Sequence, residues 1–98
     1  MLDSKTFEEL KKISQFNRKT FNQLNTEYKL RYLYNWLQFK QMEANQYGIT
    51  DNGYLFYNYK EEIVKLLRII DFDKCDEKLY NKKLECLIKK IEVETDFL

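Results

Sequence analysis

Four polar side chains toward the carboxyl end of the chain have a spacing that could bind an anionic polymer. Lys78 is followed by Asn81, Lys82 and Lys89, three, four and eleven residues further on, and a helix brings such positions to neighbouring parts of its surface. Lysine binds phosphate oxygens, and asparagine can bond to the edge of adenine. We expect these residues to form a nucleic-acid-binding surface, although an ordinary solvated helix face explains them equally well.

Eight tyrosines are the sharpest feature of the composition, and three of them fall in the run YLFYNY. An exposed aromatic patch tends to mark an interaction site, so we predict that Tyr54, Tyr57 and Tyr59 bind a partner. The alternative is that tyrosine fills a small core and points its hydroxyl to water, which we favour for the tyrosines between residues 28 and 34. Stacking of single-stranded bases on the rings is a third option.

Catalytic chemistry finds little support in the sequence. The chain has no histidine and two serines, and it lacks the glycine-rich loops that cradle phosphate groups. A Ser-His or Cys-His pair therefore cannot exist. We expect a non-catalytic protein that needs no cofactor.

The acidic run DFDKCDE is a weak candidate for a metal loop. It lacks the glycine and the distal glutamate of a calcium loop. We interpret it as a turn whose Asp73 caps the last helix, with Asp76 and Glu77 in the favourable first turn. Cys75 and Cys86 are expected to pack against the N-terminal helix rather than to act as reactive thiols.

Length and charge limit the class of protein. Ninety-eight residues with 44% hydrophobic and 16% aromatic content predict one folded domain, residues 1–98, and the formal net charge is only +1. No leader-like or membrane-spanning apolar run is present, so we expect a cytoplasmic protein with no membrane contact. The richness in Lys, Asn, Ile, Tyr and Phe is typical of an AT-rich genome, such as that of a phage or plasmid.

The first half of the chain is predicted to be helical. Residues 1–25 are expected to be a helical extension, with a helix from about Phe7 to Phe16 that resumes through Phe21 and Leu24. The strongest pattern is EYKLRYLYNWLQFKQMEANQ, which is apolar on two faces and typical of a central helix. Asn25 or Thr26 is the expected N-cap, and Gly48 the expected end.

The second half is predicted to mix strands with helices. After an Asp51-Asn52-Gly53 turn, residues 54–59 are expected to form a strand, and Asn58 to cap a helix that follows at once. A terminal strand through Val93 and Phe97 would pair with the first strand. The inward residues of the last two helices are then Ile63, Leu66, Leu67, Ile70, Tyr80, Leu84, Leu87, Ile88 and Ile91. The predicted fold is mainly α with a small β element, a winged-helix-like core over residues 26–98.

The order of these elements resembles the winged helix-turn-helix region of RepA-type plasmid replication initiators. The resemblance covers about residues 28–87 and lies in the long apolar helix, the DNG turn, the aromatic strand and the KEEI that opens the helix-turn-helix. It implies sequence-specific binding of double-stranded DNA, usually as a homodimer, with contacts from Lys78, Asn81, Lys82 and Lys89.

A second hypothesis is a small phage-encoded protein that binds and inhibits a host or defence enzyme, as anti-CRISPR proteins do. The near-neutral net charge, the acidic start of the last helix and the tyrosine run suit protein recognition. The sequence leaves both hypotheses open and favours DNA narrowly.

Overall fold

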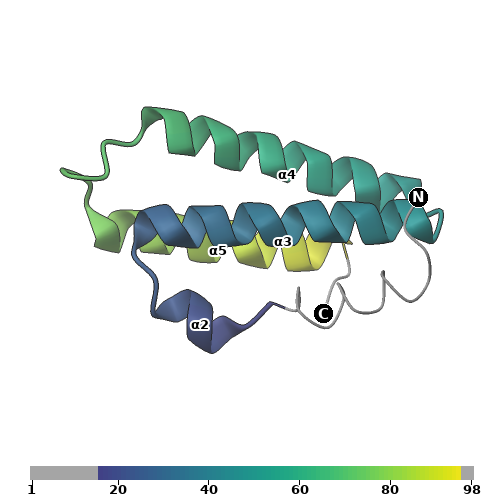
Figure 1. The fold of residues 1–98 in the computed structure, drawn as a ribbon, viewed down its shortest axis with the longest axis horizontal. Coiled ribbons are helices and arrows are strands. Elements are labelled where there is room, and N and C mark those ends of the chain that lie inside the picture. Colours follow the sequence, from purple (N-terminus) through teal and green to yellow (C-terminus); the bar gives the residue numbers. More distant parts are fainter. Residues whose placement is uncertain (1–15, 96–98) are drawn as a thin grey trace.

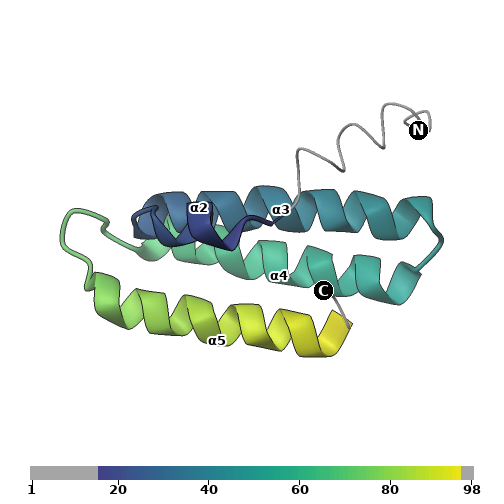
Figure 2. The ribbon, with the colours of Figure 1, turned by 90° about the horizontal axis from the view of Figure 1, so that it is seen from below.

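The described part of the protein is a bundle of three long helices with a short helix packed on one side. The computed structural model describes residues 16–95, and within them the elements are α2 (Arg18–Asn22), α3 (Thr26–Gln46), α4 (Thr50–Ile69) and α5 (Glu77–Thr95). The three long helices lie side by side and alternate in direction, and α2 lies against α3 (Figure 1, Figure 2). The helix predicted from Phe7 lies outside the described residues, apart from Phe16, which precedes α2 and is not helical.

Local sequence signals account for the bounds of α3, and both predictions are confirmed. The Asn25 side chain accepts a hydrogen bond from the Tyr28 backbone N–H at 3.0 Å, which satisfies a donor that the first helical turn leaves unpaired. Gly48 has a φ of +73°, a left-handed conformation that is easy for glycine and unfavourable for other residues. The chain therefore turns within residues 47–49 and enters α4.

The core consists of apolar side chains from all three long helices. Leu30, Leu37, Ile63 and Ile91 are at most 1% exposed, and burying such a side chain fully stabilises the fold by about 1.5–3 kcal/mol. Aromatic rings extend the core toward α2. The centre of the Phe16 ring lies 5.3 Å from the centres of the Tyr32 and Trp36 rings and 5.2 Å from the centre of the Phe21 ring. The remaining buried apolar residues include Leu33, Ala44, Phe56, Tyr59, Ile70, Leu84 and Ile88.

The strand predicted over residues 54–59 is wrong, because these residues lie inside α4. The buried side chains Phe56, Tyr59 and Ile63 stand three and four residues apart, which is the repeat of a helix face and not of a strand. The DNG turn is wrong for the same reason. Asp51 lies in the first helical turn, where a negative charge favours the helix dipole.

Two further capping predictions are corrected. Asn58 lies exposed in the middle of α4 and starts no helix. The N-cap of α5 is Asp76 instead of Asp73, since the Asp76 side chain accepts a hydrogen bond from the Leu79 backbone N–H at 3.2 Å. Asp73 sits in the preceding turn, where its N–H donates to the Asp71 carboxylate at 3.1 Å.

The described residues contain no strand and therefore no wing. The predicted terminal strand is replaced by helix as far as Thr95, and Val93 points to solvent at 82% exposure. Residues 70–76 join α4 and α5 into a hairpin in which the two helices lie alongside each other in opposite directions (Figure 2). In a helix-turn-helix motif the two helices cross at about 90–120°, so α5 here packs into the bundle along its length.

Candidate binding surfaces

The outer face of α5 carries a row of lysines. Lys78, Lys82 and Lys89 are all exposed, and their spacing of four and seven residues places them on one side of the helix. From Lys78 to Lys89 the row is about 17 Å long at 1.5 Å per residue. Within residues 16–95, none of the three ammonium groups has a carboxylate within salt-bridge distance. We call these three residues the lysine row.

Two carboxylates of α5 are engaged by other elements. Glu85 forms an ion pair with Arg18 of α2, and Glu94 accepts a hydrogen bond from the Tyr59 hydroxyl of α4 at 2.5 Å. These contacts hold two negative charges of α5 away from its lysines. Of these two carboxylates, only Glu85 is paired with a positive charge within the described part of the chain.

Two more lysines flank the row and lie over aromatic rings. The Lys83 Nζ stands 5.2 Å from the centre of the Tyr80 ring, and the Lys90 Nζ stands 6.0 Å from the centre of the Tyr59 ring. Cation–π contacts at exposed sites contribute about 0.5–1 kcal/mol each. Both lysines are exposed and add positive charge beside the lysine row.

The structure does not place Asn81 in the lysine row. Asn81 is half-buried, and its side-chain oxygen accepts a hydrogen bond from the Lys29 Nζ at 3.0 Å. Lys29 is 8% exposed and lies 5.4 Å from the centre of the Phe21 ring. This pair fastens α5 to α3, so Asn81 has a structural contact where the sequence predicted a base contact.

The three tyrosines predicted to bind a partner fall on different sides of α4. Tyr54 is 69% exposed and Tyr57 is 45% exposed, and they stand one helical turn apart on the outer face. Tyr59 is 4% exposed and belongs to the core. Its burial raises the pKa of its hydroxyl above the ordinary value of 10, and the Glu94 carboxylate adds to that rise.

The two cysteines and the acidic loop offer no further chemistry among the described residues. Cys75 is partly buried against the core and Cys86 is exposed on α5, whereas the N-terminal helix against which both were predicted to pack lies outside the described residues. No group of three or more acidic or thiol side chains in residues 16–95 could hold a metal ion. None of the described helices is long and apolar enough to cross a membrane.

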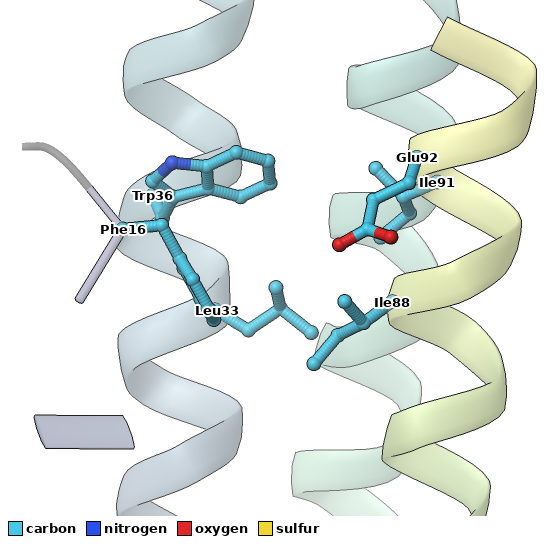
Figure 3. A pocket seen from close by; sticks show the side chains of 6 residues that line it. All are labelled: Phe16, Leu33, Trp36, Ile88, Ile91 and Glu92. Carbon is cyan, nitrogen blue, oxygen red and sulfur yellow. The ribbon is translucent and has the colours of Figure 1, made fainter. Parts of the chain in front are cut away.

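A small apolar pocket lies between α3 and α5. Leu33 and Trp36 face Ile88 and Ile91 across it, and the Glu92 carboxylate points in from α5 (Figure 3). Phe16 completes the lining. The cavity volume is about 10 Å³, which is roughly the space that one water molecule needs. The pocket is thus too small for an organic ligand.

Comparisons with known proteins give this chain no relative, because no family model, no curated protein and no solved structure matches it. The resemblance to replication initiators stays a prediction, and the strand on which it partly relied is part of α4.

Sequence reasoning missed the residues that connect α5 to the rest of the bundle. Arg18, Lys29 and Tyr59 each reach a polar side chain of α5 from 35 to 67 residues away in the sequence. A pattern of neighbouring residues cannot reveal contacts between positions so far apart in the sequence. The burial of Tyr59 did have a signal, since Phe56 and Ile63 stand three residues before it and four residues after it.

Proposed function

We propose that this protein is a non-catalytic DNA-binding module that holds the phosphate backbone of duplex DNA through the outer face of α5. The observation that carries the proposal is the lysine row of Lys78, Lys82 and Lys89, which is exposed and free of acidic partners among the described residues. Duplex DNA carries a negative charge about every 1.7 Å along its axis, so a row about 17 Å long can reach several phosphates.

The arrangement suits contacts to the backbone better than reading of bases. The lysine row has no aligned amide, because Asn81 is bound to Lys29 inside the α3–α5 contact. Direct reading of a sequence needs hydrogen bonds from side chains to base edges, whereas lysine contacts to phosphate carry no sequence information. We therefore expect weak dependence on DNA sequence and strong dependence on salt.

The test is a salt titration of binding to a fluorescent duplex of arbitrary sequence. Removing all three lysines (Lys78→Ala, Lys82→Ala and Lys89→Ala together) should weaken binding and flatten the plot of log affinity against log salt by up to about 0.9 per lysine. The matched control removes three exposed positive charges elsewhere, with Lys65→Ala, Arg68→Ala and Lys74→Ala, and should keep the wild-type slope. Equal effects of the two triple variants would overturn the proposal.

Cys86 provides an independent readout, because it is exposed and lies four residues after Lys82 and three before Lys89 on the same side of the helix. Bound DNA should slow its alkylation by a neutral reagent such as iodoacetamide, measured by mass spectrometry. Protection should be absent in the triple lysine variant. Unchanged alkylation of wild-type protein at saturating DNA would contradict binding at this face.

A second candidate function is inhibition of a host or defence enzyme through the outer face of α4. The exposure of Tyr54 and Tyr57 favours it, because tyrosine is enriched in the residues that dominate protein–protein binding energy. Capture from a phage host lysate should then depend on both rings: Tyr54→Ala and Tyr57→Ala together should lose a captured enzyme that the triple lysine variant retains. Capture that is unchanged in the tyrosine double variant would contradict the inhibitor function.

A further inference from the structure

An ion pair between α2 and α5 lies directly beside the lysine row. Arg18 donates to the Glu85 carboxylate, 67 residues away in the sequence. Both side chains are a little over 40% exposed, and exposed pairs of this kind contribute about 0–1 kcal/mol to stability. The pair therefore matters less for the fold than for the charge that α5 presents.

Arg18 is held in place by contacts within and below α2. Its guanidinium carbon lies 5.4 Å from the centre of the buried Phe21 ring. The helix itself is capped by Asn17, whose side chain accepts from the Thr20 N–H at 3.0 Å and whose own N–H donates to the Tyr32 hydroxyl at 2.8 Å. The start of α2 is thus anchored to α3, and the Arg18 guanidinium lies against Phe21 and pairs with α5.

Glu85 stands within the lysine row. It follows Lys82 by three residues and precedes Lys89 by four, and a glutamate four residues before a lysine is the favourable orientation for a pair on a helix. In the structure the Glu85 carboxylate forms an ion pair with Arg18 and with neither lysine. Without Arg18, the same carboxylate would be free to pair with Lys89 or to repel a phosphate.

We infer that Arg18 is a positioning residue of the DNA-binding face, which occupies Glu85 and so keeps Lys82 and Lys89 available to phosphates. The inference rests on the proposed function. Arginine carries five N–H donors, so Arg18 can hold Glu85 and still offer donors to a phosphate beside it. The binding face then spans two helices, α2 and α5, and its charge depends on the contact between them.

The experiment is a double-mutant cycle on duplex-DNA affinity with Arg18→Gln, Glu85→Gln and the two together. Arg18→Gln should weaken binding about tenfold, because it removes one positive charge and releases a carboxylate onto the lysine row. In the Glu85→Gln background, Arg18→Gln should lower the affinity for DNA about threefold or less. The slope of log affinity against log salt should return toward the wild-type slope. Lys19→Gln removes an exposed charge from α2 without touching Glu85, and should also cost about threefold or less.

This cycle separates the inference from a purely structural role of the ion pair. Glu85→Gln cannot restore a link that fastens α2, so loss of binding through undocking of α2 would persist in the double variant. Glu85→Gln alone should bind DNA at least as tightly as wild type, because it removes a negative charge from the face. A loss of affinity in that single variant as large as in Arg18→Gln, equal effects of Arg18→Gln in both backgrounds, or an effect no larger than that of Lys19→Gln would overturn the inference and leave the proposed function standing. Absence of salt-dependent DNA binding by the wild-type protein would overturn both.

Discussion

Tyr59 of α4 donates its phenolic hydrogen to the Glu94 carboxylate of α5, with the two oxygen atoms 2.5 Å apart. The ring is 4% exposed while Glu94 is exposed, so the hydroxyl reaches from the core to the edge of the bundle. Burial of the ring, the hydrogen bond and the negative charges of Glu94 and Glu62 all raise the pKa of Tyr59 above its ordinary value of 10. The proton on Tyr59 is thereby linked to folding.

This linkage predicts a loss of stability in alkali. Above about pH 10 the unfolded chain releases the Tyr59 proton while the folded protein keeps it. The contribution of Tyr59 is therefore fully present below pH 10 and declines as the pH rises toward its raised pKa, by up to about 1.4 kcal/mol per pH unit. Urea unfolding between pH 8 and pH 11 measures this slope. Tyr59→Phe should flatten it, and Tyr57→Phe, a change at an exposed ring, should not.

Two isoleucines of α4 provide a matched test of the core. Ile63 is 0% exposed and Ile69 is 74% exposed. Ile63→Ala should lower the free energy of unfolding by about 2–5 kcal/mol, because it removes buried methyl groups and leaves a cavity. Ile69→Ala should change that energy by no more than about 0.5 kcal/mol. Chemical denaturation of both variants measures the difference, and comparable losses would contradict the orientation of α4.

The two glycines should respond in opposite directions to alanine. Gly48→Ala forces a Cβ into the left-handed conformation at φ +73° and should destabilise the protein by about 1–2 kcal/mol. Gly53 lies inside α4, where alanine is better than glycine by up to about 1 kcal/mol. A Cβ there would stand 2.8 Å from the Asn45 Oδ1, which is the movable end of an exposed side chain. In thermal unfolding, Gly53→Ala should have a higher melting temperature than wild type, and Gly48→Ala a lower one.

The start of α5 can be tested through its two candidate caps. Asp76→Ala removes the side chain that accepts from the Leu79 N–H and should cost about 0.5–2 kcal/mol. Asp73→Ala should cost little, because Asp73 contributes its backbone N–H and not its carboxylate to the preceding turn. If Asp73→Ala proved the more harmful change in denaturant unfolding, the helix would begin earlier than Glu77.

The sequence predicted the helices whose signals are local. The N-cap at Asn25 and the end at Gly48 each depend on residues within one or two turns, and both are confirmed. The core position predicted for the tyrosines of α3 is wrong for Tyr28, which is 55% exposed. The error at residues 54–59 arose because aromatic residues favour strands on average. The helical spacing of Phe56, Tyr59 and Ile63 was the better guide, since burial against α3 and α5 overrides such preferences.

The candidate surface was predictable in part. Exposure of Lys78, Lys82 and Lys89 follows from their place opposite the apolar side of α5, and the structure agrees with it. The engagement of Asn81 by Lys29 and of Glu85 by Arg18 joins residues 52 and 67 positions apart. Such pairs depend on how the helices are stacked, and a single sequence carries no signal for that.

The short turn at Gly48 also favours one order of folding over others. Residues 47–49 join α3 to α4, two helices that pack together extensively, so closing the loop between them costs little entropy. Bundles dominated by such neighbouring contacts fold within microseconds to milliseconds. The α3–α4 hairpin can therefore form first and offer a ready surface to α5, which joins through the longer connection at residues 70–76. We therefore expect the lysine-bearing helix to dock after the α3–α4 hairpin has formed, so that the proposed DNA-binding face is completed late in folding.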